Sequence, residues 1–228
     1  MKTAIVIPAR IESTRFPEKM LAKVTKEHCL IQRVHHWCQC FADDVNDVFV
    51  ATDSKKIASL FPNQAIMTSP DCINGTERVA EAANNIYLSD YDYIINVQGD
   101  MIDVPYVFDD IKNALRHNPV VTVFTDMPAS LRHSPSSVKL FGNGTNACWF
   151  GRGSTDYGDW HLGIYGFQRW ALAAYQHLEI GEAELSENLE QLRWIHNNIP
   201  IGLVYTDSPA DEINTPEDLE RWQLTHQN

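Results

Sequence analysis

The sequence predicts an α/β fold in which a mostly parallel sheet is flanked by helices and carries a small antiparallel insertion. Up to about residue 125, short apolar segments with strand character alternate with segments of helical periodicity, a pattern typical of parallel sheets. Three strand-like segments then follow one another over about 127–167 with no helix between them. A length of 228 residues suits one domain. We therefore expect residues 1–228 to form a single domain, with the antiparallel subregion as a lid or a dimer arm.

The first half of the chain supplies four strands of the expected sheet and the helices that connect them. The triplet Thr52, Asp53 and Ser54 is a helix-start signal, and Pro105 suits the first turn of a helix. The expected strands are TAIVIP (3–8), DVFVATD (47–53), DYIINVQGD (92–100) and VVTVFT (120–125), and the expected helices cover 29–42, 55–61, 76–88 and 105–117.

The second half adds the antiparallel segments and returns to helices. The three short strands are SSVKLF (136–141), NACWF (146–150) and WHLGIYGF (160–167). Helices are expected over 168–178 and 184–197, the second with an apolar stripe of Leu185, Leu189, Leu192 and Ile195. A last strand, IGLVYT (201–206), precedes the helix TPEDLERWQLT, in which Thr215 is the expected N-cap, Pro216 the first residue and Asp218 the third.

Composition excludes several classes of protein. A net charge of −12 argues against a nucleic-acid binder, which usually carries a basic face. The apolar runs are far too short to cross a bilayer, and the N-terminus reads as a strand and not as a signal peptide, so we expect a cytoplasmic protein with no membrane partner. The five cysteines, at 29, 38, 40, 72 and 148, fit reduced thiols better than a disulfide framework, and their spacing matches no common zinc signature.

Three cations follow the first expected strand with almost nothing apolar between them. They are Arg10, Arg15 and Lys19. Ligands of parallel sheets bind outside the carboxyl ends of the strands, and three cations there suit a polyanion such as a nucleoside triphosphate. The segment is not a P-loop, since it lacks GxxxxGK[ST]. Charge alone leaves a second interpretation equally open, namely a solvated loop with incidental charges.

A carboxylate follows another expected strand at the same edge of the sheet. Asp100 comes directly after Gly99, where the strand has to turn. Carboxylates beside phosphates commonly hold Mg²⁺, although an Asp in a turn is also common for local reasons. The cation loop and the carboxylate on one sheet edge together favour a nucleotide–magnesium site.

The motifs together resemble the sugar-acid cytidylyltransferase family, and in particular its 3-deoxy-manno-octulosonate (Kdo) branch. The matching stretches occur in family order along most of the chain: IPARIESTRFPEK, VATD, NGTERVAE, IINVQGD, HLGIYGF, LEQLR and INTPEDLE. The resemblance implies a Rossmann-like nucleotidyltransferase sheet. It also implies a reaction in which the anomeric hydroxyl of a sugar acid attacks the α-phosphate of CTP and pyrophosphate leaves, as in lipopolysaccharide biosynthesis, with Mg²⁺ as cofactor and a homodimer as assembly.

The resemblance also assigns roles to residues. It implies catalytic roles for Arg10, Arg15, Lys19 and Asp100, and a metal site formed by Asp100 and Asn214. The implied nucleotide-binding residues are Pro8, Ala9, Arg10, Ser13, Arg15, Lys19, Gly75, Thr76 and Arg78, and the implied sugar-binding residues are Gln98, Arg152, His161, Glu190 and Gln191.

The sequence departs from the family pattern at three positions. Met101 stands where an acidic residue usually follows QGD, Glu18 stands where Gly usually precedes the loop lysine, and Asn214 stands where an Asp usually ligates Mg²⁺. Asn can offer a neutral oxygen, but one negative charge is lost, and Asp211 nearby is a potential replacement ligand. Two alternatives stay open: a catalytically weak nucleotide-binding homologue, and a nucleotidyltransferase for another base or another nonulosonic acid.

Overall fold

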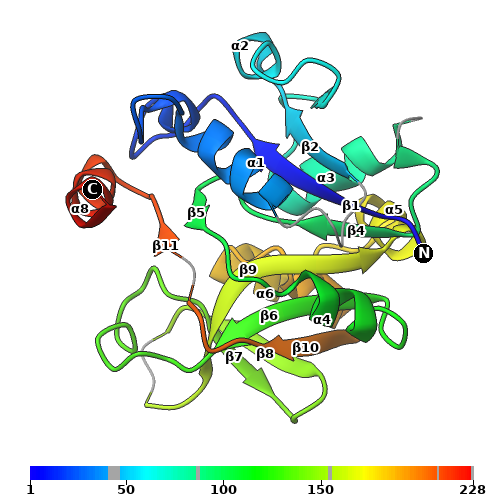
Figure 1. Ribbon diagram of the computed structural model, residues 1–228. Helices are drawn as coiled ribbons and strands as arrows, with labels where there is room; N and C mark the ends of the chain where they lie inside the picture. The colour runs from blue at the N-terminus through cyan, green and yellow to red at the C-terminus, as the bar shows by residue number, and fades with distance from the viewer. Residues whose placement is uncertain (41–46, 86–87, 154–155, 210, 227–228) are drawn as a thin grey trace.

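The computed structural model describes residues 1–40, 47–85, 88–153, 156–209 and 211–226. Its main sheet has the strand order β10-β6-β9-β4-β1-β2-β3, with β7 and β8 joined to one end of β9 (Figure 1). The strands are β1 (Thr3–Ala9), β2 (Asp47–Thr52), β3 (Ala65–Met67), β4 (Tyr93–Asn96), β6 (Val120–Thr125), β7 (Lys139–Gly142), β8 (Ala147–Gly151), β9 (Asp159–Gln168) and β10 (Ile201–Tyr205).

The predicted mixed sheet is confirmed. Strand β1 pairs in parallel with β2 on one side and with β4 on the other, and β10 is parallel to β6. Strand β9 is antiparallel to both of its neighbours, β4 and β6. The antiparallel section is therefore continuous with the main sheet, because its last strand lies between two parallel halves.

The sequence of β1 explains how helices cover both faces of the sheet. Successive side chains of a strand point to opposite faces, and all seven residues of β1 are buried. Ile5 and Ile7 belong to one core cluster, which includes residues of α1 (Leu30–Cys40), α4 (Phe108–Ala114) and α8 (Pro216–His226). Ala4 and Val6 belong to the other. That second cluster includes residues of α3 (Gly75–Ala83), α5 (Arg169–Ala174) and α7 (Leu192–His196).

Short elements account for most differences from the expected boundaries. Strands β3, β5 (Met101–Asp103) and β11 (Asp211–Glu212) were not predicted, and α2 (Lys55–Ala58) is shorter than expected. The helix expected from Pro105 begins only at Phe108, since Val107 has a non-helical φ of −136°, and residues 101–103 pair with β11 in a small antiparallel sheet. Two expected helices extend over positions 41–42 and 86–87, which lie outside the described residues.

The single helix expected over 184–197 is wrong. The segment forms α6 (Glu182–Glu187) and then α7, separated by Asn188 in the left-handed conformation with φ of 52°. The break turns Leu185 to solvent, where it is 71% exposed, while Leu189 and Leu192 stay buried. The apolar stripe therefore does not continue across the break. A short 3-10 helix, η4 (Tyr175–His177), likewise replaces the end of the helix expected over 168–178.

The C-terminal helix begins as its sequence predicts. The backbone N–H of Asp218 donates to the hydroxyl of Thr215 at 3.2 Å, and the backbone N–H of Thr215 donates to the carboxylate of Asp218 at 2.9 Å. This reciprocal pair is a capping box. Trp222 of α8 contacts α1, since the guanidinium of Arg33 lies 5.9 Å from the centroid of its ring, and Gln223 donates to the carbonyl of Lys23 at 3.0 Å. No helix in the described part of the chain has the length and apolarity required to span a membrane.

Candidate active site

One large cleft, of about 1260 Å³, lies at the carboxyl end of the central strands. Its wall includes the loop after β1, the turn after β4, part of β9, the α6–α7 connection and the segment before α8. Of the catalytic, binding and metal-ligating residues that the resemblance assigned, Thr76 does not line the cleft, because its side chain is buried in the first turn of α3. The others all do: Pro8, Ala9, Arg10, Ser13, Arg15, Lys19, Gly75, Arg78, Gln98, Asp100, Arg152, His161, Glu190, Gln191 and Asn214.

The cation loop meets the turn after β4 because β1 and β4 are parallel neighbours. The ammonium group of Lys19, which is 7% exposed, lies 2.7 Å from the carboxylate of Asp100. Arg15 donates to the side-chain oxygen of Asn214 at 3.2 Å. A Cβ atom on Gly99 would lie only 2.8 Å from the carbonyl oxygen of Pro8, so the close approach of these two segments requires glycine at this position.

The structure also accounts for Glu18, one of the departures from the family pattern. Its φ of 51° places it in the left-handed region, where glycine is the usual residue. Its carboxylate pairs with Lys56 at 2.8 Å, and Glu18 does not contribute to the wall of the cleft. The carboxylate is thus held away from the place where phosphates are expected.

Sequence reasoning missed Glu212, a carboxylate in the same part of the cleft. Asn214 donates from its amide to Glu212 at 3.1 Å, and the backbone N–H of Ile213 donates to the carbonyl of Asp100 at 2.9 Å. Glu212 is an exposed residue, but desolvation of its carboxyl by the surrounding atoms of the cleft and repulsion from Asp100 raise its pKa to about 7. The pairing of β5 with β11, which brings these residues together, involves a strand of two residues that leaves no recognisable pattern in the sequence.

The first turn of α3 and the end of β2 form another part of the wall. Asn74 caps α3 by accepting from the backbone N–H of Glu77 at 2.8 Å. Arg78 is 3% exposed, and its guanidinium donates to Asp53 at 3.0 Å and to Thr68 at 2.6 Å. These contacts fix the orientation of a buried arginine at the edge of the cleft. Gly75 lies close to Gln98, since a Cβ on Gly75 would be 3.2 Å from its side-chain oxygen.

A further part of the wall holds most of the residues assigned to a sugar acid. His161 contacts the hydroxyl of Thr122 at 2.8 Å, and this hydroxyl donates to the carbonyl of Ile164 at 2.9 Å. The imidazole therefore donates its Nε2–H to Thr122, because that hydroxyl has a single hydrogen. Burial lowers the pKa of His161 to about 3, so the ring is neutral.

Arg152, Glu190 and Gln191 complete this side. Arg152 donates to the carbonyl of Ser136 at 3.1 Å. Burial raises the pKa of Glu190, and its carboxylate accepts from the backbone N–H of Thr76 at 3.0 Å. Gln191 is 2% exposed, and its amide nitrogen has no hydrogen-bond partner among the described residues. A buried unpaired donor costs free energy, and this one belongs to a residue that lines the cleft.

The chain resembles known cytidylyltransferases along almost its whole length. Residues 4–201 match the family described as cytidylyltransferase. An 8-amino-3,8-dideoxy-manno-octulosonate cytidylyltransferase of Shewanella frigidimarina is 34% identical, over 98% of both chains. A 3-deoxy-manno-octulosonate cytidylyltransferase of Maricaulis maris is 35% identical, over 97% of this chain and 95% of the relative.

Solved structures show the same fold. The structure of CMP:2-keto-3-deoxy-manno-octonic acid synthetase complexed with CTP superposes with a TM-score of 0.87 at 29% identity, covering 100% of this chain and 99% of that one. A glucose-1-phosphate thymidylyltransferase from Bacillus anthracis superposes with a TM-score of 0.67 at 12% identity, covering 99% of this chain and 96% of that one. This second likeness concerns the fold alone.

Proposed function

The chain belongs to the cytidylyltransferase family, and from that premise we propose that it transfers CMP from CTP to the anomeric hydroxyl of a 3-deoxy sugar acid. The sugar acid is Kdo or a close relative such as its 8-amino analogue, which are the sugars named for its relatives. The anomeric oxygen forms a bond to the α-phosphorus, the bond from that phosphorus to the bridging oxygen breaks, and pyrophosphate leaves. The hydroxyl proton passes to solvent.

The observation that carries the proposal is that groups suited to a triphosphate and groups suited to a sugar acid line the same cleft. The Lys19–Asp100 pair lies in the same cleft as the unpaired amide of Gln191 and the side chain of Arg152. Nucleotidyl transfer depends mainly on positioning of the reactants and on stabilisation of phosphate charge. Arg10, Arg15 and Lys19 would hold the triphosphate and stabilise the departing pyrophosphate through charge-assisted hydrogen bonds.

The sugar side supplies complementary groups. Arg152 would pair with the carboxylate of the sugar acid, and the amide of Gln191 would donate to one of its oxygens. Glu190 and the side chain of Gln98 would accept from and donate to sugar hydroxyls. Because His161 is neutral and buried, it would contribute hydrogen bonding and shape to this side, and no proton transfer.

The residues at the Asp100 end fit a magnesium ion. Among the described residues no group of three or more His, Cys, Asp and Glu side chains is arranged as a metal site, but the donors here are two carboxylates and one amide. Asp100, Glu212 and Asn214 all offer oxygen atoms, which Mg²⁺ prefers, and Mg²⁺ usually takes only one or two carboxylates besides phosphate. When bound, the ion would reduce the charge on the α-phosphate and the pKa of the attacking hydroxyl.

Asn214 favours one alternative, a catalytically weak homologue that binds nucleotide. The loss of one carboxylate from the family pattern supports it, whereas the Lys19–Asp100 pair and the neighbouring Glu212 support an active enzyme. Because CTP is a cytoplasmic metabolite, the active enzyme would work in the cytoplasm and supply an activated sugar for lipopolysaccharide biosynthesis.

The proposal includes a homodimer. The antiparallel section carries large exposed aromatic side chains, with Trp149 40% and Tyr157 71% exposed. Tyr157 packs edge-on against Phe141 with ring centroids 5.1 Å apart. Exposed aromatic residues at an antiparallel sheet are typical of interfaces.

Pyrophosphate release tests the proposed function directly. The enzyme would be supplied with CTP and Mg²⁺ and with Kdo, 8-amino-Kdo or N-acetylneuraminic acid in turn. We expect release with one of the first two sugars and little with the third. Release with none of them, although CTP binds, would favour the catalytically weak homologue. Release with another nucleotide and not with CTP would contradict the proposal.

A further inference from the structure

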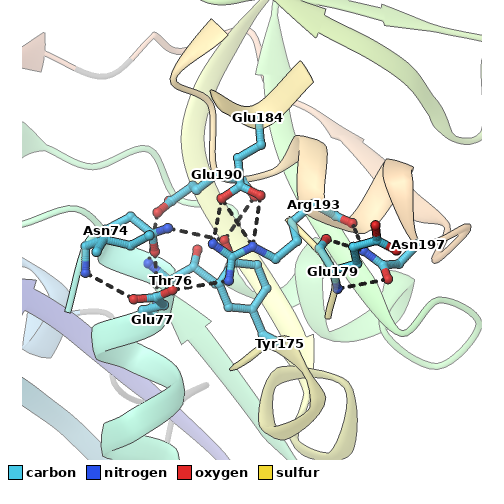
Figure 2. Close-up of polar contacts among 10 residues, drawn as sticks. Asn74, Thr76, Glu77, Tyr175, Glu179, Glu184, Glu190, Arg193 and Asn197 are labelled. Carbon is cyan, nitrogen blue, oxygen red and sulfur yellow. Dashed lines mark hydrogen bonds and ion pairs between the residues drawn. The ribbon is translucent and has the colours of Figure 1, made fainter. Parts of the chain in front are cut away.

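A buried polar network joins α3 to the α6–α7 segment (Figure 2). Arg193, which is 1% exposed, lies at its centre. Its Nε and Nη2 atoms donate to the two carboxylate oxygens of Glu184 over 2.6–3.1 Å, and its Nη1 atom donates to Glu77 at 3.2 Å. The plane of the guanidinium lies over the ring of Tyr175, 4.2 Å from its centroid. One side chain thus binds three others from three separate elements.

Two further bridges join the same segments. The hydroxyl of Tyr175 donates to the backbone carbonyl of Glu190 at 3.1 Å and accepts from the amide of Asn74 at 3.3 Å. The backbone N–H of Thr76 donates to the Glu190 carboxylate at 3.0 Å. The segment around α3 and the segment that carries Glu190 are therefore tied together through the Arg193 contacts, through Tyr175 and through Thr76.

The tied segments belong to different halves of the proposed substrate site. Gly75, in the first turn of α3, lines the part of the cleft assigned to the nucleotide, and Glu190 and Gln191 line the part assigned to the sugar acid. Arg193 follows Gln191 by two residues, yet it does not contribute to the wall of the cleft. It is thus placed to act on both halves without touching either substrate.

Stability is a weak explanation for such a network. A buried ion pair recovers the cost of desolvating its charges only when its geometry is very good, and apolar residues of similar volume often stabilise a fold equally well. The guanidinium is planar, and it binds one carboxylate through two nitrogen atoms and another through a third. Such a group fixes the orientation of both carboxylates relative to each other, which a flexible ammonium does not. The geometry therefore points to positioning.

We propose that Arg193 is a positioning residue through which binding of the nucleotide and binding of the sugar acid favour each other. The inference rests on the proposed function. A nucleotide that contacts the first turn of α3 orders that turn, and the network transmits the order to Glu190 and Gln191. The sugar acid then has less to order when it binds, which is a source of positive coupling. By linkage, the sugar acid must raise the affinity for the nucleotide by the same factor.

Calorimetry measures this coupling. The dissociation constant of the sugar acid would be determined with Mg²⁺, in the absence and in the presence of saturating α,β-methylene-CTP, an analogue that cannot release pyrophosphate. We expect the analogue to tighten sugar binding by on the order of tenfold in the wild type. Arg193→Lys keeps the positive charge but loses the planar set of N–H donors that binds two carboxylates at once. In this variant, the ratio of the dissociation constants without and with the analogue should fall close to one.

Arg33→Lys is the matched control. Arg33 is also largely buried, with a side chain 22% exposed that faces Asp103 at 3.8 Å, but it lies outside the wall of the cleft. This variant should keep the coupling of the wild type. If Arg193→Lys does not fold, as judged by thermal unfolding and circular dichroism, Tyr175→Phe removes the contacts to Asn74 and Glu190 and should reduce the coupling.

The outcomes separate the inference from the proposed function. The inference would be overturned if a folded Arg193→Lys showed the same coupling as the wild type. Where Arg193→Lys does not fold, the same result in Tyr175→Phe would overturn it. Either result would show that the network acts on stability alone. A wild type that binds both ligands independently would overturn the inference too, with the proposed function intact. A wild type that binds neither ligand would overturn the proposed function, and this inference with it.

Discussion

The ammonium group of Lys19 lies 2.7 Å from the carboxylate of Asp100, although 81 positions separate the two residues in the chain. The contact exists because β1 and β4 are adjacent and parallel, so that the segments after them leave the sheet at one edge. A buried lysine next to a carboxylate at the carboxyl end of a sheet is well placed to exchange that partner for a phosphate.

Removing the Lys19 side chain should damage turnover. Lys19→Ala deletes a charge-assisted contact worth about 1.5–3 kcal/mol, which corresponds to roughly one to two decades in kcat/KM if the contact acts in the transition state. Steady-state pyrophosphate release would measure the loss, and thermal unfolding would report the effect on folding. Lys55→Ala is the control, because Lys55 is an exposed lysine on α2, outside the wall of the cleft. Equal activity in the two variants would place the triphosphate elsewhere.

The nucleotide side should prefer CTP. Arg78 is fixed by Asp53 and Thr68 at the edge of the cleft, and a fixed donor selects among bases better than a mobile one. Calorimetric titration with CTP, UTP, ATP and GTP, each with Mg²⁺, should give the smallest dissociation constant for CTP. Asp53→Asn leaves Arg78 with a weaker partner and should narrow the difference between CTP and UTP. Tighter binding of a purine nucleotide by the wild type would refute the assignment.

The order of the elements could be predicted, because it depends on local patterns. The alternation of apolar strands and amphipathic helices marked the main elements, and the capping box of Thr215 and Asp218 marked the start of α8. Ligands of parallel sheets bind at the carboxyl ends of the strands, and this rule predicted that Lys19 and Asp100 lie close together. Each of these patterns lies within a short stretch of sequence or follows from the rule that parallel strands end at one edge.

The parts that could not be predicted depend on pairing between distant segments. Strand β11 has two residues, and only its pairing with β5 places Glu212 near Asp100. The break between α6 and α7 rests on Asn188 in a left-handed conformation, which helical periodicity did not reveal. The contact between Thr76 and Glu190 joins residues 114 positions apart, and no pattern within either stretch indicates it.

Acid should destabilise the fold through His35. Burial lowers the pKa of His35 to about 4 from its usual 6.5, and its ring packs against Phe61 with centroids 4.8 Å apart. Between pH 6.5 and pH 4, His35 is therefore protonated in the unfolded chain and neutral in the folded chain. The contribution of neutral His35 is fully present above pH 6.5 and falls by about 3 kcal/mol as the pH drops to 4.

Thermal or urea unfolding between pH 7 and pH 4 tests whether the free energy of unfolding falls with pH in this way. His35→Leu, which cannot be protonated, should lose clearly less stability than the wild type over that range. His117→Gln, at an exposed histidine, should behave like the wild type. The same loss of stability in all three proteins would assign the acid sensitivity to other groups.

The molecular mass in solution tests the homodimer. Light scattering at micromolar concentration should give about twice the chain mass of 25.9 kDa. Trp149→Glu, in the antiparallel section, should shift the mass toward that of one chain, because a charge is costly in a buried interface. Trp170→Glu is the control, since Trp170 is 61% exposed on α5. A wild type of 25.9 kDa at all concentrations would exclude the dimer.

The acidic end of the cleft should bind Mg²⁺ through Asp100 and Glu212, with Asn214 as a neutral ligand. The family pattern places a carboxylate where Asn214 stands, and Glu212 lies within hydrogen-bond distance of that amide. Glu212 would therefore restore the missing charge from a position two residues earlier in the chain. A unit charge about 4 Å from the ion contributes at least about 1 kcal/mol even in water, so Glu212→Gln should weaken metal binding at least about fivefold. Asn214→Asp should strengthen it.

Titration of Mg²⁺ in the presence of α,β-methylene-CTP measures this binding without turnover, and the Mg²⁺ dependence of pyrophosphate release gives a second measurement. Asp100→Asn should lose most of the metal binding and most of the pyrophosphate release, because Asp100 is the carboxylate paired with Lys19. Asp211→Asn removes the other acidic side chain of β11 and should change little, since it is Glu212 that contacts Asn214. If Asp211→Asn is as damaging as Asp100→Asn while Glu212→Gln binds the metal like the wild type, Asp211 is the replacement ligand, and Glu212 serves only to hold the amide of Asn214.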